Sequence, residues 1–192
     1  MNIEFQHDLE STIEETAKNF GFMLEKFRPF NKGGELNERN LTTQLLMQLN
    51  NKFHRAVVCQ EFHIPMYSDK GDSAYVDALA ITDNSLLFIE AKRNSSIISN
   101  FNEIDQDIIK LQSDALKTQF KSVCNDRRET FEQCAYGVII ADSWKKSITN
   151  RWLNQYSNKL CPDLIKNSFK ISKFSDYSDD YEILCGVFKL NW

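Results

Sequence analysis

The sequence lacks the long apolar runs that membrane spans and secretory leaders require. Nowhere are there about 18 consecutive apolar residues, and the N-terminal stretch carries Glu4, Asp8 and Glu10 without a long hydrophobic segment. We therefore expect no signal peptide and no contact with a membrane, and we predict a cytoplasmic protein.

Cysteine and histidine are few and are not spaced as metal ligands. They are scattered singly, without a C-x-x-C pair, at Cys59, Cys124, Cys134, Cys161 and Cys185 and at His7, His54 and His63. Structural zinc sites and disulfide frameworks show regular spacings of these residues. We therefore expect neither, and we predict reduced cysteines that lie mostly in the core.

An excess of positive charge is also absent. The chain has 23 Lys and Arg against 27 Asp and Glu, a formal net charge of -4. This balance argues against a protein that coats nucleic acid indiscriminately, but it leaves a local basic surface open. With 192 residues, 42% of them hydrophobic, and no repeats or low-complexity linker, the chain can bury about 70% of its unfolded surface and should form one domain.

Hydrophobic periodicity predicts the element order of an α/β protein. The predicted elements are helices at 8–27 and 37–50, strands at 56–62, 73–82 and 86–92, a long helix at 103–121, a strand at 135–141, a helix at 144–158, and strands at 169–174 and 182–190. The first helix, softened at Gly21, is interpreted as an accessory helix or a dimer surface. Within the single domain 1–192, we assign 1–34 to this accessory helix, 35–142 to the core and 143–192 to a C-terminal αββ extension.

Three charged residues interrupt strand-like apolar runs. Asp77 lies in the run 75–81, and Glu90 and Lys92 lie in the run 86–92. A carboxylate in a half-buried strand is costly unless it is paired, neutralised or bound to a cation. These residues therefore indicate a site.

The turn between the two runs limits how the three residues meet. A two-residue loop within 83–85 allows two even registers, in which Asp77 lies opposite Glu90 or opposite Lys92. Both registers put all three side chains on one face, whereas a three-residue loop with a bulge would shift this parity. Because like charges that face each other are unfavourable by up to about 1 kcal/mol, a divalent cation between Asp77 and Glu90 is the natural remedy.

The element order, Asp77, the tripeptide Glu90-Ala91-Lys92 and a preceding helix that carries Glu38 together resemble the PD-(D/E)xK nuclease superfamily. Its fold is the restriction-endonuclease-like αβββαβ core, a central mixed sheet flanked by helices, which Holliday-junction resolvases and many phage-defence and repair nucleases share. The resemblance covers roughly residues 37–141. Val76 departs from it, since the family name places proline before the aspartate.

The resemblance implies a metal-dependent nuclease that hydrolyses phosphodiester bonds in DNA. In such enzymes the residues matching Asp77 and Glu90 hold one or two Mg2+ or Mn2+ ions, often with the backbone carbonyl of the residue matching Ala91. The residue matching Lys92 orients or deprotonates the attacking water. Glu38 resembles a helix glutamate that binds a metal directly or through water. A carboxylate-bound Mg2+ supplies the charge relief and the nucleophile that phosphodiester hydrolysis needs near neutral pH.

Purely structural roles for the same residues stay open. Asp77 and Glu90 also fit a buried ion pair with Lys92, Glu38 fits the preference of a first helical turn for acids, and Lys92 fits a strand-end lysine that reaches solvent. The first alternative function is a catalytically silent module that binds nucleic acid or protein, although such a module has no need to keep all three charged strand residues. The second is an unrelated α/β protein of a regulatory or toxin–antitoxin pair, favoured if Asp77 and Glu90 point to opposite faces of the sheet.

The long helix offers a surface for the nucleic-acid backbone. Its apolar residues form two neighbouring core stripes, Ile104, Ile108, Leu111 and Ala115 in one and Ile109, Leu116 and Phe120 in the other. Lys110, Lys117 and Lys121 gather on the remaining face, either as a solvated surface or, together with Arg93, as cations for phosphate groups.

Partner choice is expected outside the resembling core, in the N-terminal helix and the C-terminal hairpin. Nothing in them resembles a helix-turn-helix, a zinc finger or a helicase motif, so the sequence does not support sequence-specific recognition. A homodimer and association with another subunit both stay open, beside the expected DNA partner.

Overall fold

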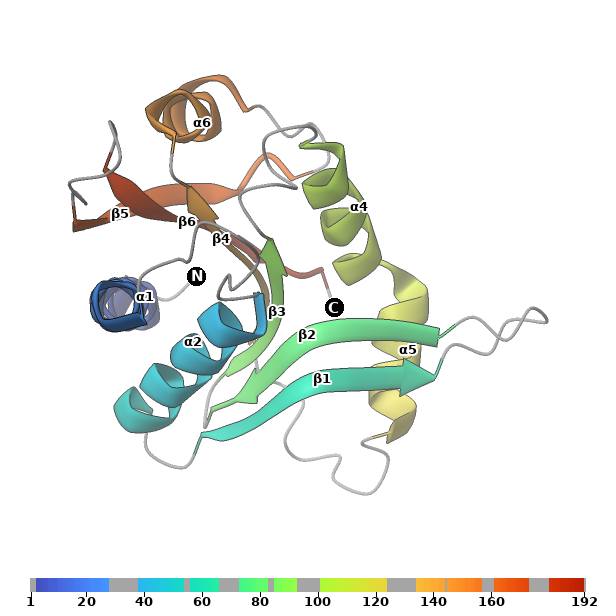
Figure 1. The fold of residues 1–192 in the computed structure, drawn as a ribbon. Helices are drawn as coiled ribbons and strands as arrows, with labels where there is room; N and C mark the ends of the chain where they lie inside the picture. Colours follow the sequence, from blue (N-terminus) through green and yellow to red (C-terminus); the bar gives the residue numbers. More distant parts are fainter. Residues whose placement is uncertain are drawn as a thin grey trace.

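A mixed six-stranded sheet, in the order β1-β2-β3-β4-β6-β5, forms the centre of the protein (Figure 1). The computed structural model describes residues 3–27, 38–53, 56–65, 73–82, 85–92, 101–123, 134–143, 145–156, 161–172 and 180–191. Helices flank the sheet, so the chain is an α/β protein, as predicted.

The strands agree with the predicted ones to within four residues at either end. They are β1 (Val57–Pro65), β2 (Ser73–Ile81), β3 (Ser85–Lys92), β4 (Cys134–Ser143), β5 (Ile165–Ser172) and β6 (Tyr181–Lys189). Neighbouring strands pair antiparallel except β3 and β4, which are parallel. β3 and β4 are buried over nearly their whole length, because helices cover both faces of the sheet there.

The described helices are α1 (Ile3–Phe27), α2 (Glu38–Lys52), α4 (Asn102–Leu111), α5 (Asp114–Val123), α6 (Lys146–Asn150) and the π-helical turn η2 (Arg151–Gln155). α1 begins five residues earlier than predicted and continues through Gly21, so the predicted softening there is wrong. The predicted helix 144–158 corresponds to α6 followed directly by η2, which together span residues 146–155 of the described chain.

The predicted long helix 103–121 is two helices, α4 and α5. The Ser113 hydroxyl lies between them: it donates to Lys110 O at 2.8 Å and accepts from the Leu116 backbone N–H at 3.2 Å. A serine side chain that takes up backbone groups in this way ends one helix and caps the next. The break changes the helical phase, so Ala115 is exposed rather than in the predicted core stripe, while Leu116 and Phe120 are buried.

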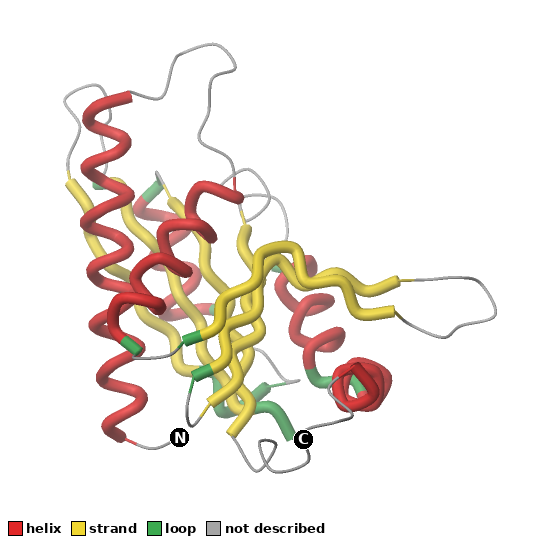
Figure 2. The backbone as a smooth tube through the Cα atoms, turned by 90° about the horizontal axis from the view of Figure 1, so that it is seen from below, coloured by secondary structure: helices red, strands yellow, loops and turns green. Residues whose placement is uncertain are grey.

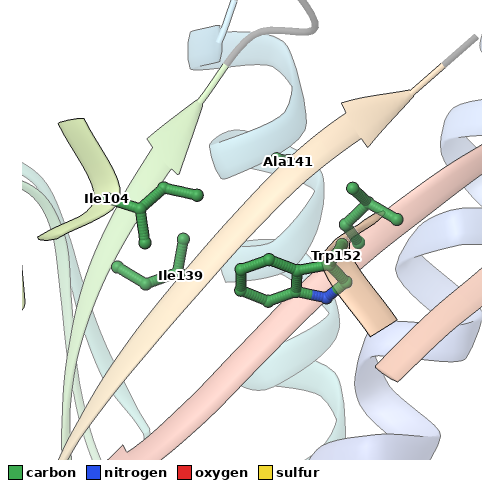
Figure 3. A pocket seen from close by; sticks show the side chains of 5 residues that line it. Ile104, Ile139, Ala141 and Trp152 are labelled. Atoms are coloured by element: carbon green, nitrogen blue, oxygen red, sulfur yellow. The ribbon is translucent and has the colours of Figure 1, made fainter. Parts of the chain in front are cut away.

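Two hydrophobic cores lie on opposite faces of the sheet. α1 and α2 contribute to the core on one face, and α4, α5, α6 and η2 contribute to the core on the other. Figure 3 shows part of the second core, where Ile104 of α4 and Trp152 of η2 lie beside Ile139 of β4. Ile104, together with Ile108 and Leu111, is buried as predicted and anchors α4 against the sheet.

The C-terminal strands complete the sheet. β6 pairs with β4, and β5 pairs with β6, so the segment predicted as an extension continues the same six-stranded sheet. The apolar stripe of α1, from Leu9 to Leu24, is buried against α2 and β5. This stripe is therefore used inside the fold and does not form a free dimer surface.

Among the described residues, no helix has both the length and the apolar character needed to cross a membrane. The four described cysteines are free thiols: Cys161 and Cys185 are buried, Cys59 is partly buried and Cys134 is exposed. Cys124 lies outside the described residues.

Candidate active site

The β2–β3 hairpin adopts the first of the two predicted registers. Ala78 pairs with Ile89 and Ile81 pairs with Leu86. The Thr82 backbone N–H donates to Ser85 O at 2.9 Å, which leaves a two-residue loop. Continuing this register by one step from Ala78 brings Asp77 to the position opposite Glu90.

β2 separates from β3 at Asp77. Residues 73–76 of β2 stay paired with 62–65 of β1 but have no described partner on β3. We call these paired segments the β1–β2 arm, and Figures 1 and 2 show the arm running on beyond the rest of the sheet. The candidate site lies where the arm leaves the sheet.

The regular alternation of side chains is interrupted at the same point. Val76 and Leu79 pack in the core beneath α4 and α5, whereas Ala78 packs in the core beneath α2. Asp77 lies at this change of phase. The predicted sharing of one face by Asp77, Glu90 and Lys92 is therefore too simple, because strict alternation holds only for a regular strand.

Glu61 of β1, between the two residues that pair with Val76 and Ala78, has a φ of 53°. This left-handed conformation is strained for a residue with a side chain. Backbone strain of this kind is common near functional sites. Here it coincides with the bend of β1 and β2 beside Asp77.

The Asp77 carboxylate bridges the gap between the separating strands. Its Oδ2 accepts a hydrogen bond of 2.7 Å from the backbone N–H of Ala91 on β3. Asp77 also lines a cavity of about 220 Å3 together with Arg39, Thr42, Gln60 and Glu61. Arg39 and Glu61 form an ion pair of 2.6 Å at this cavity. The aspartate thus contacts the Glu90-Ala91-Lys92 segment on one side and an open cavity on the other.

Glu90 is a buried carboxylate that has a lysine as its partner. Only 3% of its side chain is exposed, and Oε1 lies 2.5 Å from Lys110 Nζ on α4. Burial raises the pKa of Glu90 to about 8, although the charge of Lys110 opposes the increase. The negative charges of Asp107 and Asp77 add to the increase. Glu90 is therefore a site where a cation would be strongly favoured.

Lys92 is held by an acid that sequence reasoning missed. Its Nζ lies 2.7 Å from Oδ2 of Asp107, and both side chains are largely buried. Burial lowers the pKa of Lys92, but the contact with Asp107, together with the charges of Glu90 and Asp77, raises it above its ordinary value. Lys92 is thus a persistent ammonium ion that does not reach solvent freely.

Asp77 belongs to the same electrostatic centre. Its charge acts on the pKa of both Glu90 and Lys92. An unrelated α/β protein would be favoured if Asp77 and Glu90 point to opposite faces of the sheet. Glu90 contacts Lys110 of α4, whereas Asp77 lines a cavity with residues of α2 on the other face, so this alternative stays a candidate. The proposed pair of Lys92 with Asp77 and Glu90 is replaced by two pairs that use α4: Lys92 with Asp107, and Glu90 with Lys110.

The position of Asp107 among apolar residues could have identified it from the sequence. It follows Ile104 by three residues and precedes Leu111 by four, so it lies on the buried stripe of α4 and is only 8% exposed. An acid on such a stripe needs a cationic partner, and the lysine at the end of β3 is that partner.

The structure describes only some of the other candidate residues. Glu38 is the first residue of α2, and its side chain lies outside what the structure describes, as does the whole of Arg93. On α5, Lys117 is partly buried and Lys121 is exposed. Lys110 contacts Glu90 and donates to Tyr75 O at 3.0 Å, so it does not share a solvated lysine face with them.

The donor set suits a hard cation such as Mg2+. Asp77 and Glu90 supply carboxylate oxygens from neighbouring strands, and the intervening Ala91 supplies a backbone carbonyl. Glu90 Oε1 and Asp107 Oδ2 are buried and accept no hydrogen bond among the described residues; their lysines meet them through ion pairs alone. Among these residues no group of three or more His, Cys, Asp or Glu side chains is arranged around a metal position. Asp77 and Glu90 are thus two carboxylates of the type that binds Mg2+, and the side chain of Glu38 lies outside the described residues.

Comparisons of the chain with protein-family models, with curated proteins and with solved structures find no match.

Proposed function

We propose that this chain is a Mg2+- or Mn2+-dependent nuclease of the PD-(D/E)xK type that hydrolyses phosphodiester bonds in DNA. One observation carries the proposal: where β2 leaves β3, Asp77 accepts a hydrogen bond from the backbone N–H between Glu90 and Lys92, and Glu90 is buried with its pKa raised to about 8. Perturbed carboxylates beside a cavity are typical of catalytic centres.

The arrangement of elements supports a restriction-endonuclease-like fold. The chain follows the αβββαβ order with α2, β1, β2, β3, the two successive helices α4 and α5, and β4. The pair α4 and α5 takes the place of the second helix. β2 and β3 form an antiparallel hairpin, and β3 lies parallel to β4. The helices of the proposed core lie on both faces of the sheet.

The chain's own residues divide the chemistry between them. Asp77 and Glu90, with the Ala91 carbonyl, would hold the cation. When bound, a divalent ion of this kind relieves charge on the phosphate and makes a water nucleophilic near neutral pH. Lys92 stays protonated, so its role is to orient the attacking water and to balance charge on a phosphate oxygen rather than to remove a proton. Asp107 positions Lys92 for this role.

The cavity beside Asp77 gives the phosphate a place to enter. Its volume is about 220 Å3. Arg39 and Gln60 line it, and their side chains carry N–H groups that would donate to phosphate oxygens.

A catalytically silent binding module is the second candidate. The observation that favours it is the pairing of both buried acids with lysines, Glu90 with Lys110 and Asp107 with Lys92. Such pairs neutralise the acids without a metal ion.

Cleavage assays distinguish the two candidates. Supercoiled, linear, single-stranded and branched DNA are incubated with the protein in Mg2+, Mn2+ or EDTA, and the unaltered chain is compared with Asp77→Ala and Lys92→Ala. The matched controls are Asp180→Asn and Lys170→Ala, which break an exposed ion pair of 3.1 Å at the far side of the sheet. We expect metal-dependent cleavage that both site variants abolish and both controls keep. Cleavage that survives both site substitutions would refute the proposed centre, and binding of DNA without cleavage would favour the silent module.

A further inference from the structure

Lys110 lies where a cation would sit on Glu90. Its ammonium nitrogen is 2.5 Å from Glu90 Oε1, 3.6 Å from Asp107 Oδ1 and 3.0 Å from the Tyr75 carbonyl oxygen. It therefore joins β3, α4 and the β1–β2 arm at the deepest carboxylate of the site.

The two lysines of the centre are held unequally. Lys92 is 17% exposed and contacts Asp107 at 2.7 Å, whereas Lys110 is 29% exposed and lies 3.6 Å from that aspartate. Among the described residues, Glu90 is the nearest side-chain partner of Lys110, and Asp107 is a more distant one. Lys110, the more exposed of the two lysines, therefore has the shorter route to solvent.

Replacing the Lys110 ammonium by a divalent ion would balance the charges of the centre. With Glu90 ionised, as it must be to bind a metal ion, the three carboxylates of Asp77, Glu90 and Asp107 face two ammonium groups, which leaves one negative charge. A divalent ion added beside both lysines would make the centre positive, and it would place two cations on one buried oxygen. A divalent ion that replaces Lys110 makes the centre neutral.

We propose that Lys110 is a built-in counter-ion, which occupies the cation position on Glu90 in the metal-free chain and is expelled when a divalent ion binds. The inference rests on the proposed metal site. The flexible lysine stem carries the released ammonium toward solvent beside the arm, where it meets a substrate phosphate. Lys110 thus lowers the affinity for metal, and it couples metal binding to nucleic-acid binding.

The first measurement is Mn2+ binding by isothermal titration calorimetry. Lys110→Gln removes the charge and keeps a donor for the Tyr75 carbonyl, so we expect its Mn2+ affinity to rise by about tenfold or more. Lys110→Arg keeps the charge, so we expect an affinity close to that of the unaltered chain. This conservative variant separates charge from packing, and a thermal melt of each variant confirms that it is folded.

Lys146→Gln is the matched control. Lys146 Nζ lies 3.0 Å from Oε1 of Glu182, which is 1% exposed, so this substitution also removes a lysine from a buried glutamate. Glu182 lies on β6, two strands from Glu90. We expect its Mn2+ affinity to be unchanged. An equal gain in Lys146→Gln and Lys110→Gln would show a general charge effect and would overturn the proposal.

Failure of this inference and failure of the proposed function give different results. If the unaltered chain binds Mn2+ and Asp77→Ala abolishes binding, the metal site stands. An affinity of Lys110→Gln equal to or below that of the unaltered chain then overturns the role of Lys110 alone. If the unaltered chain binds no Mn2+, the metal site and the inference fail together.

The coupling is tested by fluorescence anisotropy with a labelled DNA oligonucleotide. Ca2+ is the added ion, because its oxygen preference resembles that of Mg2+ while cleavage is avoided. We expect Ca2+ to tighten DNA binding more in the unaltered chain than in Lys110→Gln, because only the former gains an ammonium. An equal Ca2+ effect in both proteins would overturn the coupling.

Discussion

Substitution of Glu90 by glutamine tests the electrostatics of the centre without requiring any catalytic activity. The ordinary pKa of a glutamic acid is 4.5, and burial raises that of Glu90 to about 8. Between these two values the folded chain keeps a proton that the unfolded chain has lost. Stability therefore falls as pH rises through this window, by up to about 1.4 kcal/mol per pH unit. Glutamine has nearly the same shape as the protonated acid and does not ionise.

The magnitude follows from the displacement of the pKa. At pH 5 the two proteins are expected to differ in free energy of unfolding by less than about 1 kcal/mol. At pH 7 the Glu90→Gln variant should be more stable by about 3 kcal/mol, since the unaltered chain must then keep a proton on an acid that would be ionised in the unfolded state. In a chain of this size that corresponds to a melting temperature higher by about 10 °C.

Urea denaturation in EDTA, followed by circular dichroism from pH 5 to pH 8, measures this difference. Parallel stability curves for the two proteins, with a gap that does not grow with pH, would refute the reasoning. Repetition with Mg2+ adds a second condition. The ion should stabilise the unaltered chain and narrow the gap, because it binds the ionised carboxylate in the folded state alone.

Three further changes test individual features. Asp107→Asn removes the anion that holds Lys92, so the pKa of Lys92, followed by NMR, should fall; an unchanged pKa would contradict the assigned pair. In urea denaturation, Glu61→Gly should have a free energy of unfolding about 1 kcal/mol higher than Glu61→Ala, because only glycine adopts a φ of 53° without strain. Equal stabilities would remove the argument for strain. Ser113→Ala should cost about 1 kcal/mol in urea denaturation, because the first turn of α5 loses its cap, and a neutral result would mean that water replaces the hydroxyl.

Local patterns predicted the hairpin at the centre of the site. The turn residues at 83–85 allowed two registers, and the structure has the one that brings Asp77 opposite Glu90. This prediction succeeded because a two-residue turn and the pairing of its flanking residues are set within a short stretch of chain.

The partners from α4 were harder to predict. Treating 103–121 as one helix placed Lys110 on an outer face with Lys117 and Lys121, but the Ser113 cap ends α4 before α5 begins. A lysine also has a long stem, so its ammonium reaches a buried carboxylate from a position that periodicity marks as polar. Sequence spacing therefore located the acids of the strands but not the helix residues that pair with the centre.

The pairing of distant segments was not predictable from periodicity. β6 joins β4 across more than 35 residues, and nothing in the alternation of residues 182–190 identifies that neighbour. Glu182, at 1% exposure, is buried only because this pairing brings it beside Ser143 and within reach of Lys146. The apolar stripe of α1 was likewise visible, but its packing partner was not.

The hydrogen bond from Lys110 to Tyr75 connects the charged centre to the β1–β2 arm. The carbonyl of Tyr75 belongs to the β1–β2 arm, and the ammonium that holds it also holds Glu90. One ammonium group of α4 therefore contacts both the arm and the buried carboxylate of β3. Any event that draws the ammonium away from both groups removes this hydrogen bond, while Val76 and Phe62 still pack the arm against α5. The charge state of the centre and this polar contact between α4 and the arm therefore change together.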